Sequence, residues 1–299
     1  MKKIITILKF LIGFSILFFL FYKIGFIDII NTFKRLELPF ILAAIVLHIL
    51  IFFLGCFNIK VLLNSIEKRI KFLRLFKYYM ISWSFGLFIP GNVGEFSLIY
   101  FLKKKDVSIG EGTSIMMIDK VITLMITALI ALAGFFIFFP KDVFRLSLFL
   151  FAIFVILAFS LTNTGRMLIK RYILRKYAVK FKGFSRVLFH IFKEKKSYLF
   201  LNFLLTILRF IVIGLVFLVI FVSLGQSIGL TQIIIINSIG IIISLIPITP
   251  AGLGVREAVA VLLYSRIGVP GEVTITVYLF FAILNYLTAA INFLVQKIE

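Results

Sequence analysis

The sequence predicts an all-α polytopic membrane protein with about six full transmembrane helices and two Pro/Gly-broken re-entrant hairpins, arranged as an inverted repeat. The first observation is composition: 62% of the 299 residues are hydrophobic and 15% are charged, whereas soluble domains are roughly 45–50% apolar and about 25% charged. The second is a series of long apolar runs, and the third is a pair of similar runs that Pro and Gly interrupt. A soluble domain is excluded.

Six apolar segments are long enough to cross a bilayer, because about 20 residues at 1.5 Å rise span the hydrocarbon layer. Lys2 and Lys3 precede the first segment as in a signal peptide, but no small-x-small cleavage pattern follows near Tyr22, so we interpret it as an uncleaved helix. The segments are 4–22, 39–63, 113–139, 143–161, 198–222 and 273–296.

Two further apolar stretches, 78–102 and 231–264, are interrupted near their middle. Proline removes a backbone donor and glycine permits turns, so each cluster should end one helix and begin another within the membrane. Such a segment is either a re-entrant hairpin or a broken span. The predicted turn residues are Pro90, Gly91, Gly94, Pro250, Gly252 and Gly254.

The distribution of positive charge favours hairpins. If both broken segments return to the side they left, the cytoplasmic side carries 23 Lys/Arg, eleven of them between Arg166 and Lys196, and the opposite side, with its 23–38 loop, carries six. Both termini are then cytoplasmic. If the first broken segment crossed instead, Lys103–Lys105 would lie outside. For the second segment only two basic residues, Arg266 and Lys297, indicate the side of the membrane. A re-entrant hairpin and a broken span are therefore both possible for this segment.

The two broken stretches resemble each other. Residues 88–111 and 248–272 both contain Pro-x-x-x-Gly, a Glu shortly after it, an apolar half-helix and then Gly-Glu. We therefore predict a single membrane domain, 1–299, with pseudo-repeat halves at about 1–139 and 140–299. Three full crossings per half would invert one half relative to the other, as in many transporters.

Basic residues alternate with apolar ones in the segment 162–198. This pattern favours an amphipathic helix on the anionic cytoplasmic leaflet, and recruitment of lipid headgroups is the alternative. No segment outside the membrane is long enough for a nucleic-acid reader, so we expect no nucleic-acid partner despite the formal charge of +21.

We place six charged residues at membrane depth, where each costs roughly 2.5–3.5 kcal/mol on insertion scales. Glu95 and Glu257 each follow a Pro/Gly turn, so they either cap a half-helix or face a shared cavity whose helix ends bind a lipid phosphate. In the second case Arg256, with Lys120 and Arg209, supplies positive charge. A structural ion pair between helices is the alternative for Asp119 and Lys120. The candidate site is Arg256, Glu257, Glu95, Lys120, Asp119 and Arg209.

The sequence gives no sign of a metal site, a cofactor or an enzyme. Cys56 is the only cysteine, and neither His48 nor His190 has a neighbouring set of metal ligands. No Gly-x-Ser-x-Gly, Walker loop or paired-carboxylate pattern occurs.

The motifs Pro90-Gly91-Asn92-Val93-Gly94-Glu95, Asp119-Lys120 and Pro250-Ala251-Gly252-Leu253-Gly254-Val255-Arg256-Glu257 resemble those of the lysylphosphatidylglycerol synthase transmembrane region, or flippase-like domain, family. The resemblance covers roughly residues 5–295. It implies a lipid-handling membrane domain, associated in fused members with moving a modified phospholipid across the bilayer. Because the sequence ends at Glu299 without the soluble aminoacyl-transferase domain of fused members, we do not expect synthase activity.

The function that these observations favour is a flippase-like lipid translocase in the cytoplasmic membrane, carrying a phospholipid or a polyprenyl-phosphate-linked lipid. Without an ATP motif, transport would be facilitated or ion-coupled. Two alternatives stay open: a membrane-embedded lipid or glycolipid transferase that uses Glu257 or Asp119 as base, and a non-catalytic partner of a lipid-synthesis enzyme. The expected partners are membrane lipids and the anionic leaflet; cargo, direction, coupling ion and oligomeric state stay open.

Overall fold

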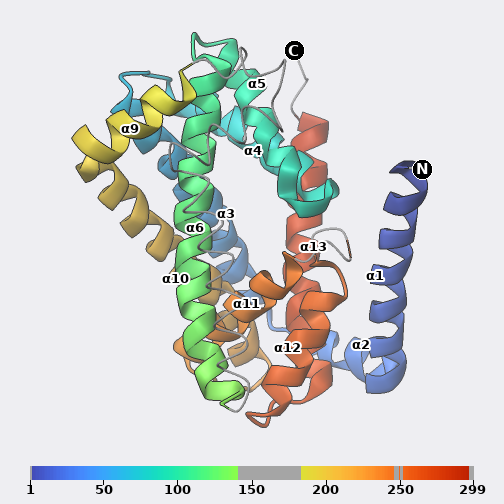
Figure 1. Ribbon diagram of the computed structural model, residues 1–299. Helices are drawn as coiled ribbons and strands as arrows, with labels where there is room; N and C mark the ends of the chain where they lie inside the picture. The colour runs from blue at the N-terminus through green and yellow to red at the C-terminus, as the bar shows by residue number, and fades with distance from the viewer. Residues whose placement is uncertain (1, 141–182, 246–248, 250–251, 296–299) are drawn as a thin grey trace. The chain divides into compact units, whose positions relative to one another are not determined.

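The computed structural model describes residues 2–140, 183–245, 249 and 252–295. All regular elements in these ranges are helices (Figure 1). The predicted segment 143–161 lies outside the described residues.

The chain forms two compact units, each described by itself. Helices α3 (Leu38–Ser65), α4 (Phe72–Phe88) and α10 (Lys196–Ser223) contribute to both. The units interleave in sequence. The single membrane domain, its pseudo-repeat halves 1–139 and 140–299 and the inverted repeat stay predictions. Unit one comprises Met1–Leu54, Met80–Glu95 and Leu208–Glu299, and unit two comprises Gly55–Tyr79 and Phe96–Ile207.

Several helices are long and apolar enough to span a membrane, which confirms an all-helical, polytopic membrane protein. In the described part of the chain these are α3, α6 (Ile109–Phe138), α10 and α13 (Gly271–Val295). A fifth candidate is the bent pair of α1 (Lys2–Ile24) and α2 (Phe26–Lys34), which meet at 84°. Six full spans stay a prediction. Many large apolar side chains on these helices are exposed, as expected of lipid-facing surfaces.

Helix α2 lies within the segment 23–38, which the sequence suggested to be a loop. Gly25, with φ of +106°, ends α1 and lets the chain turn sharply into α2. Ile29 and Thr32, one turn apart on α2, are buried. The segment is therefore an amphipathic helix packed against α13, which the pattern alone did not reveal because α2 has only nine residues.

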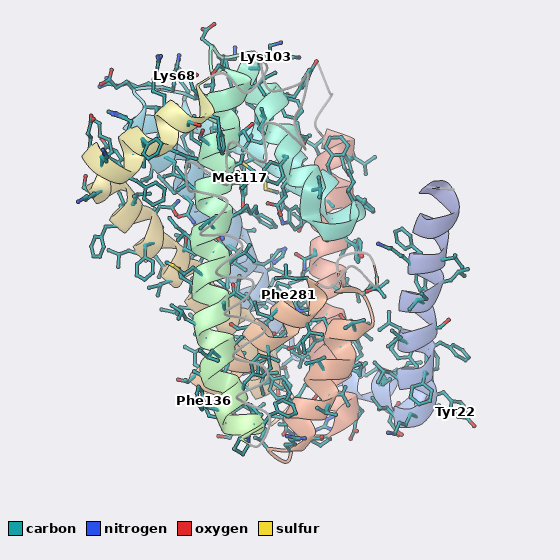
Figure 2. All side chains as sticks on the ribbon, in the orientation of Figure 1. Tyr22, Lys68, Lys103, Met117, Phe136 and Phe281 are labelled. Carbon is teal, nitrogen blue, oxygen red and sulfur yellow. The ribbon has the colours of Figure 1, made fainter. Side chains whose placement is uncertain are left out.

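The first broken segment begins and ends in unit two, as a hairpin would, and its middle part, Met80–Glu95, belongs to unit one. Helix α4 ends at Phe88, a 3-10 turn (η1) runs over Pro90–Ser97, and α5 spans Leu98–Lys103. The chain entering α4 meets the chain leaving α5, because Lys68 Nζ donates to the Asp106 carbonyl at 2.6 Å. Figure 2 shows Lys68 and Lys103 at one end of unit two and Phe136 at its opposite end, where α6 ends. That this hairpin re-enters a membrane stays a prediction.

The second broken segment lies in unit one. Helix α11 (Leu230–Ser244) packs against α12 (Val255–Ser265), which also contacts α13 and α1. Gly252 and Gly254 have positive φ angles of +76° and +80°, so these two predicted turn glycines are required by the backbone. An added Cβ at Gly254 would lie 2.6 Å from the Gly13 carbonyl oxygen of α1. The break is as the sequence predicts, and its relation to a membrane stays a prediction.

Only the last part of the predicted basic segment 162–198 is described. Helix α9 (Phe184–Glu194) buries Val187, Leu188 and Ile191 in unit two and exposes the charged residues Arg186 and Lys193. The helix is therefore amphipathic. Its association with a lipid leaflet stays a prediction, and residues 162–182 lie outside the described residues.

Candidate functional site

Arg256 occupies the first turn of α12, directly after the glycine-rich turn of unit one. Its guanidinium carbon lies 5.5 Å from the ring centroid of Tyr278, 5.7 Å from that of Phe281 and 5.9 Å from that of Phe217. Cations over aromatic faces are stabilised by the ring quadrupole, by about 0.5–2 kcal/mol per contact. We call the three rings the aromatic cage. They hold the charge of Arg256 in place without neutralising it.

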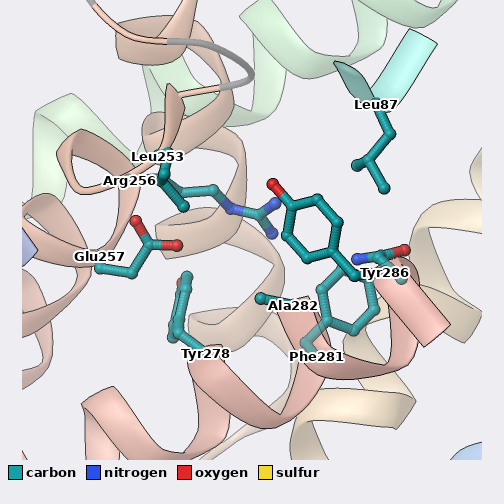
Figure 3. Close-up of a pocket in the computed structure, with 9 residues that line it drawn as sticks. Leu87, Leu253, Arg256, Glu257, Tyr278, Phe281, Ala282 and Tyr286 are labelled. Carbon is teal, nitrogen blue, oxygen red and sulfur yellow. The ribbon is translucent and has the colours of Figure 1, made fainter. Parts of the chain in front are cut away.

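A small cavity of about 60 Å³ adjoins the guanidinium. Since a water molecule takes about 30 Å³ of liquid, the cavity has room for a small polar group, and lipid tails would lie outside it. Figure 3 shows the Arg256 guanidinium and the Tyr286 ring directed toward one another. The lining mixes apolar, aromatic and amide side chains: Leu87, Leu253, Arg256, Glu257, Tyr278, Phe281, Ala282, Asn285 and Tyr286.

Glu257, the neighbour of Arg256, is buried and caps α12. Its Oε2 accepts a hydrogen bond from the Gly254 backbone N–H at 2.7 Å. A carboxylate in this position satisfies one of the free donors at a helix N-terminus and interacts favourably with the helix dipole. Glu257 therefore has the capping geometry, and it also lines the cavity. The two sequence hypotheses for this residue are compatible, and lipid contact stays a prediction.

Hydrogen bonding holds the cage residue Tyr278 in place. Its hydroxyl donates to Asn237 Oδ1 on α11 at 2.6 Å, and its ring packs edge-on against Phe217. A series of side-chain contacts from α11 through α13 to α10 thus positions the rings around Arg256. The site is built on helices that pack against one another, which makes it a rigid surface for a ligand.

The sequence did not reveal the cage residues Phe217, Tyr278 and Phe281, nor Asn237. The one available signal is the spacing of Tyr278, Phe281 and Asn285, which places them on one face of α13. With 38 Phe residues in the chain, this spacing could not be distinguished from ordinary lipid-facing or core positions.

Glu95 lies in η1, also in unit one. Its side chain packs against Gly86 of α4, where an added Cβ would lie 2.6 Å from Glu95 Cγ. The lining residue that α4 gives to the cavity is Leu87, so the structure does not bring Glu95 into the lining set. That Glu95 shares a lipid-binding cavity with Glu257 stays a prediction. Of the turn residues near it, Gly94 is buried, and Pro90 and Gly91 are placed by their backbone in η1. Pro250 lies outside the described residues.

The other predicted site residues are distributed over both units. Arg209 lies on α10 in unit one, eight residues before Phe217. Asp119 and Lys120 lie on α6 in unit two, where Asp119 is 3% exposed and its Oδ1 is 3.4 Å from the Asn202 amide nitrogen that donates to it. Shared action of Asp119, Lys120 and Arg209 with Arg256 therefore stays a prediction.

Comparison with known proteins identifies the family of nearly the whole chain. Among curated proteins there is no match. The family model described as lysylphosphatidylglycerol synthase TM region matches residues 6–291, a range that contains both glycine-rich turns, Asp119-Lys120 and the Arg256 cavity. The chain therefore belongs to the lysylphosphatidylglycerol synthase transmembrane-region family.

Proposed function

We propose that this protein is a lipid translocase that moves a phospholipid or a polyprenyl-phosphate-linked lipid across the cytoplasmic membrane and binds the lipid phosphate at Arg256. The observation that carries the proposal is the caged guanidinium beside a small cavity. Within the part of the chain that the structure describes, the Arg256 Nε has no hydrogen-bond partner. The group thus keeps donor capacity for a ligand.

The chemistry of this site suits a phosphate on an apolar molecule. Guanidinium donors match phosphate oxygens in pairs, and such charge-assisted bonds are strong where water is excluded. Tyr286 and Asn285 add polar groups on the same lining, and Leu87 and Leu253 add apolar contact. Membership in a family named for the membrane region of a lipid synthase supports a lipid ligand.

The transferase alternative has less support. Its candidate bases are the carboxylates of Glu257 and Asp119, and each already has a structural hydrogen bond, Glu257 from the Gly254 N–H and Asp119 from Asn202. We therefore propose a non-enzymatic role, with facilitated or ion-coupled transport. Stable co-purification with a lipid-synthesis enzyme would instead favour the partner role.

The direct test is lipid translocation in proteoliposomes that contain a fluorescent phospholipid, read by quenching of the outer leaflet. Arg256→Gln should reduce the rate by about tenfold or more, because a charge-assisted hydrogen bond contributes about 1.5–3 kcal/mol. The matched control is Arg74→Gln, which removes an exposed arginine of α4 and should change the rate little.

The two variants separate a ligand role from a structural one. Both must elute as the wild type does in size-exclusion chromatography before the rates are compared. A folded Arg256→Gln protein that translocates lipid as fast as Arg74→Gln would overturn the proposal. Arg256→Lys should give an intermediate rate, because it keeps the charge and loses the paired donors.

A further inference from the structure

Unit two contains a cluster of buried polar side chains that the Arg256 cavity does not include. Asn58 comes from α3, Asp119 from α6, and Asn202 and Thr206 from α10. The exposed fraction of Asp119 is 3% and that of the other three is 0%. All four lie on helices that are apolar enough to span a membrane, where buried polar groups are costly and commonly functional.

Hydrogen bonds join the four side chains into one network. The Asn202 Nδ2 donates to the backbone carbonyl oxygen of Asn58 at 3.2 Å and to Asp119 Oδ1 at 3.4 Å. The Asn58 Nδ2 donates to Thr206 Oγ1 at 3.0 Å, and Thr206 Oγ1 donates to the backbone carbonyl oxygen of Asn202 at 2.8 Å.

These bonds fix the orientation of both amides. Rotating the Asn202 amide by half a turn would place its oxygen against two acceptors. Rotating the Asn58 amide would place its oxygen against Thr206 Oγ1, whose proton is already donated to Asn202. The side-chain oxygens of Asn58 and Asn202 therefore stay acceptors.

Both of these oxygens, Asn58 Oδ1 and Asn202 Oδ1, are buried and have no hydrogen-bond partner among the described residues. A buried acceptor left unsatisfied costs about 1–3 kcal/mol. Since Asn202 Oδ1 shares a carbon with the nitrogen that contacts Asp119, it lies within a few ångström of the carboxylate. The cluster thus combines two unsatisfied oxygens with a carboxylate and calls for a positive partner.

We propose that Asp119, Asn58 and Asn202 bind a monovalent hard cation of the Na⁺ class between α3, α6 and α10. Carboxylate and amide oxygens are the ligands that hard cations prefer, and thiolate or imidazole ligands would be needed for softer metals. A single carboxylate neutralises a single positive charge, which favours a monovalent ion over Ca²⁺ or Mg²⁺. The cation would satisfy both amide oxygens and compensate the buried charge together.

This binding site does not rest on the proposed lipid transport, because it is assigned from unit two alone. If both proposals hold, the ion would supply the coupling that a transporter without an ATP motif needs, since transporters commonly bind coupling ions at polar sites between their helices.

The test is thermal unfolding of the purified protein in detergent, with NaCl replacing choline chloride at constant ionic strength. A ligand that binds only the folded state raises the melting temperature with concentration. We expect a rise of a few degrees that saturates with Na⁺ in the wild type and is lost in Asp119→Asn. This substitution keeps the shape of the side chain and an acceptor for Asn202, so we expect the variant to fold.

The matched control is Asn292→Ala, which removes a buried amide of α13 in unit one whose Nδ2 donates to Ser84 Oγ at 2.8 Å. This variant should melt at a lower temperature than the wild type and keep the full Na⁺ response. An Asn292→Ala protein that also loses the response would overturn the assignment to Asp119.

Radioactive ²²Na⁺ binding to the wild type keeps the proposal testable if Asp119→Asn does not fold. Saturable binding that unlabelled Na⁺ displaces, and that Asn202→Ser reduces, supports the site. Absence of saturable binding overturns it. A melting temperature that depends on pH and not on Na⁺ also overturns it, because Asp119 would then bind a proton and no metal ion.

Discussion

At the scale of single residues, Arg256 and Glu257 stand next to each other but have different tasks. The guanidinium lies within the aromatic cage, and the carboxylate caps the backbone of α12 at Gly254. One motif, Gly-Val-Arg-Glu, thus supplies both the proposed ligand group and the hydrogen bond that holds the turn carrying it. Substitutions at these positions should separate stability from transport.

Glu257→Gln tests the capping role. The amide keeps an oxygen for the Gly254 N–H but loses the charge, so we expect a loss of about 1 kcal/mol in folding stability and a melting temperature lower by a few degrees in detergent. Translocation should stay near the wild-type rate. Glu272→Gln, in the first turn of α13 and outside the cavity lining, is the control and should change little. If Glu257→Gln melts like the wild type but translocates slowly, the carboxylate contacts the cargo and capping is not its main role.

Phe281→Leu tests the aromatic cage. Loss of one ring face removes about 0.5–2 kcal/mol of cation–π stabilisation, so lipid affinity should fall by roughly twofold to thirtyfold, measured by titration of a fluorescent phospholipid. The control, Phe293→Leu, also removes a ring from α13, one that contacts Phe85 and Phe88. Equal losses in the two variants would show that general packing, and not the cage, is responsible.

At the scale of elements, the approach of α1 to α12 depends on glycine at two positions. The Gly254 backbone has a φ of +80°, and an added Cβ would lie 2.6 Å from the Gly13 carbonyl oxygen. At Gly13 an added Cβ would lie 3.1 Å from the Leu253 carbonyl oxygen. Small residues allow transmembrane helices to pack backbone to backbone, so the turn that carries Arg256 is held against α1.

Gly254→Ala should therefore destabilise the protein more than Gly268→Ala. Gly268 also has a positive φ, +81°, but an added Cβ there has nothing within 4 Å. Both variants carry the backbone strain of a non-glycine residue, about 1–3 kcal/mol, and only Gly254→Ala adds a collision with α1. Thermal unfolding in detergent measures the difference. Equal melting temperatures would mean that α1 moves away without cost.

At the scale of the whole molecule, the charge asymmetry predicts which side of the membrane each loop faces. The contact between Lys68 and the Asp106 carbonyl places the chain before α4 and the chain after α5 at the same end of unit two, as the hairpin interpretation requires. The same-side arrangement of these two loops is thus a feature of the fold. Their cytoplasmic location stays a prediction, based on the 23 basic residues that the hairpin interpretation places on that side and the six that it places opposite.

Cysteine labelling tests this topology in a Cys56→Ser background. A membrane-impermeant maleimide added outside intact cells should modify a cysteine at Ile27, which is 71% exposed on α2, and should leave one at Lys104 unmodified until the cells are permeabilised. Modification of position 104 from outside alone would show that the first broken segment crosses the membrane.

Much of the fold could be predicted because it depends on local properties of the chain. Long apolar runs must form helices in lipid, where every backbone polar group needs an internal partner, and this determines α3, α6, α10 and α13. Clusters of proline and glycine within an apolar run interrupt a helix, which determines the breaks before α5 and α12. The Arg256-Glu257 pair was recognisable because charges are scarce in apolar sequence.

The functional geometry was decided only by tertiary structure. The aromatic cage joins Phe217 of α10 to Tyr278 and Phe281 of α13, and the proposed cation site joins Asn58, Asp119 and Asn202 from three helices. No local pattern encodes such contacts, since they depend on how helices distant in sequence rotate and pack. The sequence by itself determined that the chain enters the membrane and where its helices break. Both depend on local composition, because lipid requires every backbone polar group to have an internal hydrogen-bond partner. Which of its many aromatic and polar side chains meet was determined by packing.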